Sequence, residues 1–131
     1  EESKIEVLSE DEQLIEDNRK SANESAQNWA SNIVNKKVEI KADDGVTLRG
    51  TEYITDENTE NWVIILHGYR AEPKSVLTIG EHFSEKGYNV LIPSMRACAN
   101  SDGEFVGMGW LDKDDLFQKV CVSLCMILLI A

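Results

Sequence analysis

The middle of the chain carries two apolar runs separated by a segment of helical spacing. Residues 62–66 are apolar without a break, and residues 88–93 form a second, mostly apolar run. Apolar runs of this length that end at a loop are typical of strands buried on both faces of a parallel sheet. Between them, residues 73–87 place apolar side chains at roughly helical intervals, at Val76, Leu77, Ile79 and Phe83. The pattern predicts a strand–helix–strand unit whose loops gather at the carboxyl edge of the sheet, where ligands bind in open α/β folds.

A polar–apolar alternation precedes this unit and predicts an antiparallel hairpin. Residues 37–41 alternate with a period of two, and Asp43-Asp44-Gly45 is a strong turn signal. Residues 46–53 then read as the returning strand. Asp43 and Asp44 look like a carboxylate pair, but turn chemistry explains both of them.

The N-terminal segment predicts a helix. Ser9 and Glu12 have the spacing of a capping box. Beyond it, apolar residues fall on one thin stripe of a helix whose opposite face is heavily charged. The stripe consists of Ile15, Ala22, Ala26, Trp29 and Ile33. We expect this helix to pack on the outside of the domain, with a partner-binding helix as the alternative.

The C-terminal end changes character abruptly. Residues 110–119 predict the start of a helix, with Asp112, Asp114 and Asp115 near its positive N-terminal end. Residues 120–131 are almost entirely apolar. This run is shorter than the about 20 residues needed to span a bilayer, and it has no polar face for a surface helix. The sequence therefore divides into an acidic helical segment (1–35), an α/β segment (36–119) and an atypical apolar tail (120–131).

The net charge of the chain disfavours some classes of binding partner. The 131 residues carry a formal net charge of −11, with nine acidic and three basic residues among the first 32. This balance disfavours nucleic acid and anionic membranes as partners, and we interpret it as promoting solubility. No signal peptide or transmembrane span is visible, and cytoplasmic, secreted and cell-surface locations all stay open.

The cysteines favour neither a disulfide framework nor a metal site. Cys98, Cys121 and Cys125 are odd in number and form no CxxC pair, and only His67 and His82 are available as further ligands. We expect buried thiols. A redox role for Cys121 and Cys125 is the alternative, although their four-residue spacing in an apolar run suggests inert side chains.

Three motifs, in order along the chain, resemble one enzyme family. Residues 67–69 (His-Gly-Tyr) follow the first apolar run, and residues 96–103 (Arg-Ala-Cys-Ala-Asn-Ser-Asp-Gly) follow the second, before residues 107–110 (Gly-Met-Gly-Trp). Over residues 38–116 the chain is similar to the N-terminal part of the α/β-hydrolase superfamily, in a bacterial branch of serine esterases, lipases and peptidases. The resemblance implies an α/β fold class with part of the α/β-hydrolase sheet. This part comprises an antiparallel hairpin and then a parallel strand–helix–strand unit, preceded by the N-terminal helix.

The catalytic residues of that family have no counterpart in the sequence. The nucleophile stands in Gly-x-Ser-x-Gly on a sharp strand-to-helix turn, and the triad follows in the order Ser, Asp or Glu, His. The chain contains no such motif. Its nearest imitation, Ser123 between Cys121 and Cys125, comes too soon after Trp110 and is followed by no histidine. No catalytic residue is therefore identifiable among these residues, and the implied chemistry needs neither a metal nor an organic cofactor.

The resemblance does assign supporting parts of a site. It implies that the backbone N–H of Tyr69 points at the developing oxyanion. It places His67 and Gly68 as supports of that loop, and Arg70, Arg96 and Ser101 as residues of the site mouth. Arg70 would meet an acidic group of the substrate there, with a solvated surface arginine as the alternative.

One loop departs from the family pattern. Ala97 and Ala99 stand where the family has glycines, on either side of Cys98. Because alanine resists the positive φ values that glycine adopts freely, we expect this loop to have a different shape.

These features predict a portion of a serine hydrolase that acts on small-molecule ester or peptide substrates through an acyl-enzyme. The 131 residues alone lack the nucleophile, so we expect them to be inactive. The abrupt tail suggests truncation or a shifted reading frame past Leu116. The alternative is a non-catalytic α/β module that binds a ligand or partner through its carboxyl-edge loops and its acidic N-terminal helix. This alternative does not explain why the three motifs occur in the order found in hydrolases.

The resemblance also implies an unpaired strand edge. Residues 61–66 would normally pair with a fifth strand, for which the sequence has no ordinary counterpart. We expect residues 126–130 either to fill this position as a strand or to leave an apolar edge through which the chain self-associates.

Overall fold

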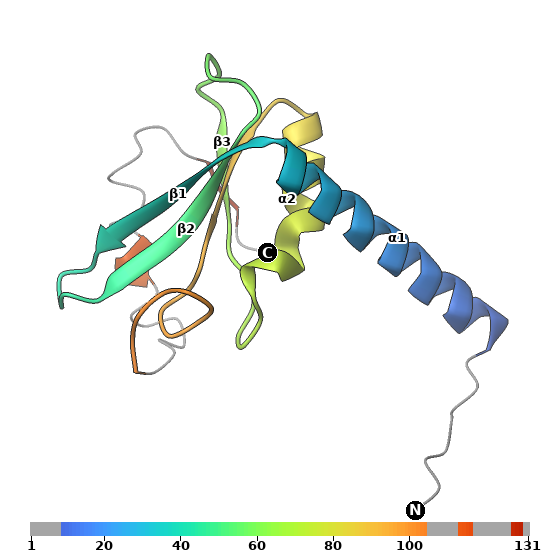
Figure 1. Cartoon of the computed structure of the whole chain (residues 1–131), viewed down its shortest axis with the longest axis horizontal. Helices are drawn as coiled ribbons and strands as arrows, with labels where there is room; N and C mark the ends of the chain where they lie inside the picture. Colours follow the sequence, from blue (N-terminus) through green and yellow to red (C-terminus); the bar gives the residue numbers. More distant parts are fainter. Residues whose placement is uncertain (1–8, 105–112, 117–126, 130–131) are drawn as a thin grey trace, which may run out of the picture.

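The computed structural model describes residues 9–104, 113–116 and 127–129 of the chain. Helices and strands form a two-layer arrangement, with the α-helices α1 and α2 packed on one face of a mixed sheet (Figure 1). The strand order is β1-β2-β4-β3-β5. The elements are α1 (Glu10–Asn32), β1 (Val34–Lys41), β2 (Thr47–Ile54), β3 (Trp62–Ile65), the short 3-10 helix η1 (Pro73–Val76), α2 (Leu77–Glu85), β4 (Asn89–Pro93) and β5 (Ile127–Leu129).

The predicted strand–helix–strand unit is confirmed. Strands β3 and β4 pair in parallel, with Val63 opposite Val90, and η1 and α2 connect them. Val63, Ile65, Val90 and Ile92 alternate along their strands and so share one face of the sheet, where they form a buried cluster with residues of both long helices. Ile64, on the opposite face, is also fully buried, as expected for a central strand of such a unit.

The predicted hairpin is also confirmed. Strands β1 and β2 pair antiparallel, and β2 then pairs antiparallel with β4. The Asp44 carboxylate accepts the N–H of Val46 at 3.2 Å, and Gly45 adopts a φ of 87°. Both are features of the turn chemistry that Asp and Gly favour. Strand β1 begins at Val34, earlier than the alternation indicated, because Val34 still finds a partner in Ile54 of β2.

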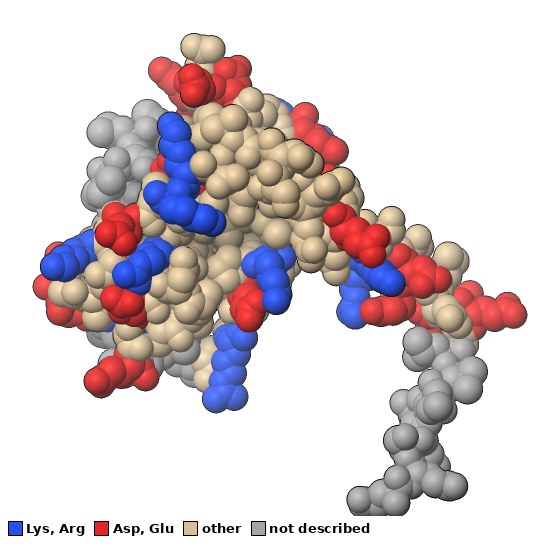
Figure 2. Space-filling view, in the orientation of Figure 1, with Lys and Arg blue, Asp and Glu red and all other residues tan. Residues whose placement is uncertain are grey.

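Helix α1 packs through only one of its ends. Its capping box is present, with Ser9 and Glu12 bonded reciprocally. Ala26 is buried and Trp29 packs against the core, but Ile15 is 66% exposed, so the predicted stripe is in contact only over its C-terminal part. The other end of α1 projects beyond the sheet (Figure 1), and acidic side chains line the projecting part (Figure 2).

A short strand of the tail pairs with the edge of the sheet. Strand β5 runs parallel to β3, with Leu128 opposite Ile64. The tail therefore fills the position next to β3, which was one of the two outcomes expected from the sequence. Residues 113–116 are helical, in agreement with the helix predicted there. The motif at residues 107–110 and the segment around Ser123 lie outside the described residues. Among the helices that the structure describes, none combines the length and the apolar character needed to cross a membrane.

Candidate functional site

The candidate site is formed by the loops that follow β3 and β4. Because these strands are parallel neighbours, their carboxyl ends meet at the same edge of the sheet. The first loop, residues 66–72, contains the His-Gly-Tyr motif, and the second, residues 94–104, contains the Arg-Ala-Cys-Ala-Asn-Ser-Asp-Gly motif. The sequence prediction that both motifs lie at this edge agrees with the observed topology.

His67 joins the two loops. Its imidazole is buried, and its Nε2 accepts the backbone N–H of Met95 at 3.0 Å. Because a backbone N–H can only donate, Nε2 carries the lone pair and the ring proton stands on Nδ1. From there it donates to the carbonyl of Gly68 at 3.1 Å. Both ring nitrogens are thus engaged by the backbone, which leaves no free lone pair for a substrate proton.

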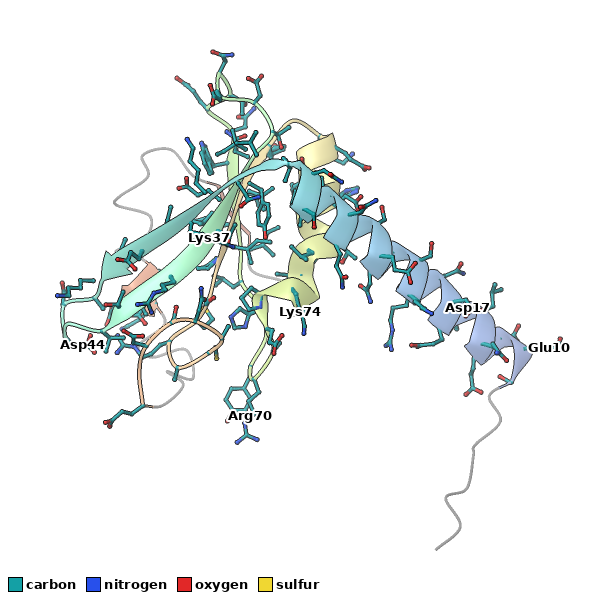
Figure 3. The ribbon with its side chains drawn as sticks, viewed as in Figure 1. Glu10, Asp17, Lys37, Asp44, Arg70 and Lys74 are labelled. Carbon is teal, nitrogen blue, oxygen red and sulfur yellow. The ribbon has the colours of Figure 1, made fainter. Side chains whose placement is uncertain are left out.

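Tyr69 and Arg70 occupy the two central positions of a tight turn. The N–H of Ala71 donates to the carbonyl of Gly68 at 3.0 Å and closes the turn. Arg70 has a φ of 57°, in the left-handed region that the third residue of a type II turn requires. Tyr69 is 60% exposed, and the guanidinium carbon of Arg70 lies 5.4 Å from the centroid of its ring. Arg70 stands at the tip of the loop and points away from the sheet (Figure 3).

Arg96 is placed differently from what the sequence suggested. Its side chain is only 6% exposed and makes a two-pronged contact with Asp115, Nε to Oδ2 at 3.0 Å and Nη2 to Oδ1 at 2.8 Å. On its other side Nη1 donates to Asp44 at 2.6 Å. These hydrogen bonds raise the pKa of Arg96, Asp115 contributing most, and keep it charged. A guanidinium enclosed by two carboxylates argues against the site-mouth role and for a structural one.

The pairing also acts on Asp44. The hydrogen bond from Arg96 holds the pKa of the Asp44 carboxyl below its ordinary value, and the bond from the Val46 N–H adds to the effect. Asp44 therefore serves both the turn and the arginine, whereas the sequence accounted only for the turn.

Ser101 fastens the second loop to the hairpin. Its hydroxyl donates to the carbonyl of Ser94 at 2.8 Å and accepts the N–H of Arg49 in β2 at 2.8 Å. The Arg49 side chain reaches the same loop, bonding the carbonyl of Asn100 at 2.6 Å and the carboxylate of Asp102 at 2.8 Å. Ser101 is buried, so its placement too favours a structural contact over a position at the site mouth.

The second loop keeps a glycine-like backbone despite its alanines. Ala97 and Ala99 have φ values of 56° and 48°, and Gly103 has a φ of 130°. Both alanines therefore adopt the positive φ that the sequence argument expected them to avoid. The bonds from Ala97 N–H to Asp102 and from Ser101 N–H to Cys98 hold the loop in place. These contacts oppose the cost of the left-handed alanines.

The sequence missed the long-range partners of this loop. Asp44 and Asp115 flank Arg96 from 52 and 19 positions away along the chain. No periodicity connects such positions. The available signal was chemical: Arg96 lies three residues after a buried strand, and an arginine that is buried there needs a carboxylate partner.

No metal-binding arrangement is found in the part of the chain that the structure describes. No group of three or more His, Cys, Asp or Glu side chains converges there. Cys98 is buried and forms no disulfide with any residue that the structure describes. Cys121 and Cys125 lie outside the described residues.

Several solved structures resemble the fold of this chain. No protein-family model and no curated protein matches the chain. Solved structures that match the chain with a probability of 1.00 include the following three. The Pyrococcus furiosus esterase Pf2001 is 30% identical, with a TM-score of 0.56 over 73% of this chain and 36% of its own. The α/β hydrolase GrgF from Penicillium sp. sh18 is 21% identical, with a TM-score of 0.60 over 75% and 37%. DcsB, solved with a substrate analogue, is 24% identical, with a TM-score of 0.62 over 74% and 37%.

The chain carries part of an α/β-hydrolase fold. The expected class, with its hairpin, parallel unit and N-terminal helix, is thereby confirmed. The chain spans only a little over a third of the solved chains that it matches, 37% in the case of DcsB. Because one α/β-hydrolase fold supports several chemistries, the fold identifies the location of a site and not its reaction.

Proposed function

We propose that this chain supplies the oxyanion-stabilising loop of a serine hydrolase that cleaves small-molecule ester or peptide bonds through an acyl-enzyme. The observation that carries the proposal is the fixed loop after β3. His67 ties it to the neighbouring loop through Met95, and the turn that follows presents Tyr69 at the carboxyl edge. One of the similar solved structures is an esterase, which supports the same class of reaction.

The backbone N–H of Tyr69 is the proposed donor. Within residues 9–104, 113–116 and 127–129, no acceptor receives this N–H. A backbone donor held rigidly before the reaction stabilises developing charge without paying for reorganisation at the transition state. In this proposal His67 and Gly68 position the loop and perform no proton transfer, which agrees with the occupied nitrogens of His67.

The chain alone does not complete the reaction in this proposal. It contains no Gly-x-Ser-x-Gly motif, and an oxyanion donor accelerates hydrolysis only beside a nucleophile. The nucleophile and its base would come from residues other than these 131.

A labelling experiment tests the proposal. The protein from its native source is treated with a fluorophosphonate, which reacts with activated serines, and its intact mass is measured. We expect a labelled protein about twice the 14.7 kDa of this chain, and no label on the isolated 131 residues. A native protein of 14.7 kDa that takes no label would overturn the proposal and favour a non-catalytic binding module.

A matched pair of variants then isolates the role of the Tyr69 N–H in the labelled protein. Tyr69→Pro removes the N–H, and proline is tolerated because Tyr69 is the second residue of the turn, where proline is favoured. We expect kcat to fall by roughly 10²- to 10³-fold, as when one oxyanion donor is lost. Tyr69→Phe keeps the N–H and should retain nearly full kcat. Equal rates for the two variants would contradict the assignment.

A further inference from the structure

Arg70 differs from the other arginines in its surroundings. Arg19, Arg49 and Arg96 each pair with a carboxylate. Arg70 is exposed, and no carboxylate among the described residues lies within ion-pair distance of it. In a chain with 24 acidic residues and a net charge of −11, such a position leaves a positive charge available at the candidate site.

The backbone at Arg70 is unfavourable for an arginine. Its φ of 57° lies where glycine or asparagine is preferred. Glycine would relieve this conformation, so the local geometry of the turn gives no reason for a long cationic side chain. Backbone outliers of this kind at the rim of a site point to a functional constraint.

The side chain is partly organised in advance. The guanidinium carbon is 5.4 Å from the centre of the Tyr69 ring, within the range of a cation–π contact. A guanidinium restrained by a neighbouring ring loses less freedom on binding than a fully mobile one. Figure 3 shows Arg70 at the tip of its loop and directed away from the sheet, so the loop itself does not enclose its charge.

We propose that Arg70 recognises a carboxylate on the substrate and thereby selects anionic esters, such as half-esters of dicarboxylic acids. This inference rests on the proposed function, because it places the carboxylate of the substrate beside the carbonyl oxygen to which the Tyr69 N–H would donate. The Tyr69 N–H and the Arg70 guanidinium belong to consecutive residues of one turn. A planar guanidinium matches the two oxygens of a carboxylate.

A singly charged group fits the site better than a phosphate dianion. Lys74, the next cation along the same loop region, is already paired with Glu72 at 2.7 Å. Arg70 therefore offers one compensating charge in a strongly acidic chain. A second negative charge on the ligand would remain uncompensated there.

Binding to the full 131-residue chain tests the inference without requiring catalysis. Monomethyl glutarate, which carries one carboxylate and one ester, is compared with neutral dimethyl glutarate and with methyl phosphate. Amide and arginine side-chain signals are followed by ¹H–¹⁵N NMR in the unmodified chain, in Arg70→Gln, and in Arg19→Gln as a control on an arginine already paired with Glu16. We expect the half-ester to bind about five-fold more tightly than the diester, the upper range for an exposed ion pair.

The outcomes separate this inference from the proposed function. We expect Arg70→Gln to reduce half-ester binding to the diester level and Arg19→Gln to leave it unchanged. Equal binding of both esters, an equal loss in both variants, or tighter binding of methyl phosphate would overturn the carboxylate role. If the Tyr69 N–H still shifts with both esters in that case, the oxyanion assignment stands alone. If Arg70 responds to the half-ester and Tyr69 to neither ester, the oxyanion assignment fails and the anion site remains.

Discussion

At the scale of single residues, charged side chains hold the candidate site together. Arg96 bridges the hairpin turn, through Asp44, to the helical segment that contains Asp115. Removing one member of such a buried pair leaves an uncompensated charge, which is far more costly than the pair is stabilising. The same loop is fastened to β2 by the backbone and hydroxyl bonds of Ser101. The conformation of the second loop therefore depends on the ion pairs of Arg96 and the hydrogen bonds of Ser101.

Asp44 makes the stability of this arrangement depend on pH. The hydrogen bond from Arg96 lowers its pKa from the ordinary value of 3.8. A lowered pKa in the folded state adds stability that is present above pH 3.8 and is lost as the pH falls through the folded-state pKa. We expect Asp44→Asn to be less stable than the unmodified chain near pH 6, and the gap between them to narrow progressively below pH 4. Urea unfolding followed by circular dichroism at several pH values measures this gap.

The matched control for that experiment is Asp43→Asn. It removes a carboxylate one position away, for which no ion pair with Arg96 is found. A gap that narrows equally for both variants would mean that net charge, rather than the Arg96 contact, governs the acid response.

At the scale of elements, helix α1 is anchored by its last two turns. Trp29 stacks on Tyr53 with ring centroids 4.9 Å apart, and its Nε1 donates to the hydroxyl of Ser84 in α2 at 3.1 Å. A Cβ at Gly80 would stand 3.1 Å from the Trp29 ring, so glycine allows the two helices to approach closely here. Ser25 adds a bond to Glu81 at 2.8 Å. The projecting half of α1 has no comparable contact with the described part of the sheet or of α2.

Because only one end of α1 is packed, we expect two side-chain truncations on this helix to differ in their effect on stability. Trp29→Ala removes the stacking and the hydrogen bond, and we expect the free energy of unfolding to fall by about 2–3 kcal/mol for this half-buried side chain. Ile15→Ala acts on an exposed residue of the projecting half and should change it by less than about 0.5 kcal/mol. Urea unfolding monitored at 222 nm compares the two. Similar losses would show that the whole length of α1 is packed in solution.

At the scale of the whole molecule, the sequence predicted what local patterns determine. The hairpin, the parallel unit and the cap of α1 each have a signal within a few residues, such as the turn at Gly45 or the spacing of Ser9 and Glu12. These signals were sufficient to place the His-Gly-Tyr loop at the carboxyl edge of the sheet.

The features that were missed depend on contacts between distant positions. The burial of Arg96 depends on Asp44 and Asp115, and the left-handed backbone of Ala97 depends on a bond to Asp102 and on the packing around it. Propensity alone predicted the opposite conformation for that alanine, because the tertiary contacts outweigh it. The exposure of the first half of α1 likewise follows from where the sheet ends, which no helical stripe reveals.

Within the described part of the chain, the β3 side of the sheet is covered by one short strand. Strand β5 pairs with β3 over three residues, Val63 to Ile65 opposite Ile127 to Leu129, and thereby shields the backbone of a strongly apolar strand. Exposed edges of that kind promote association between chains. Self-association is therefore expected to depend on whether β5 stays in place.

Proline substitution in β5 tests that dependence. Successive N–H groups of a strand alternate between its two sides, so replacing both Ile127 and Leu128 by proline must remove a donor that faces β3. We expect the doubly substituted chain to associate in size-exclusion chromatography with light scattering, and the unmodified chain to elute as a monomer of 14.7 kDa. A variant with valine at both positions keeps the donors and should behave as the unmodified chain. If the proline variant remains monomeric, β5 does not protect the edge, and the apolar β3 must be shielded in another way.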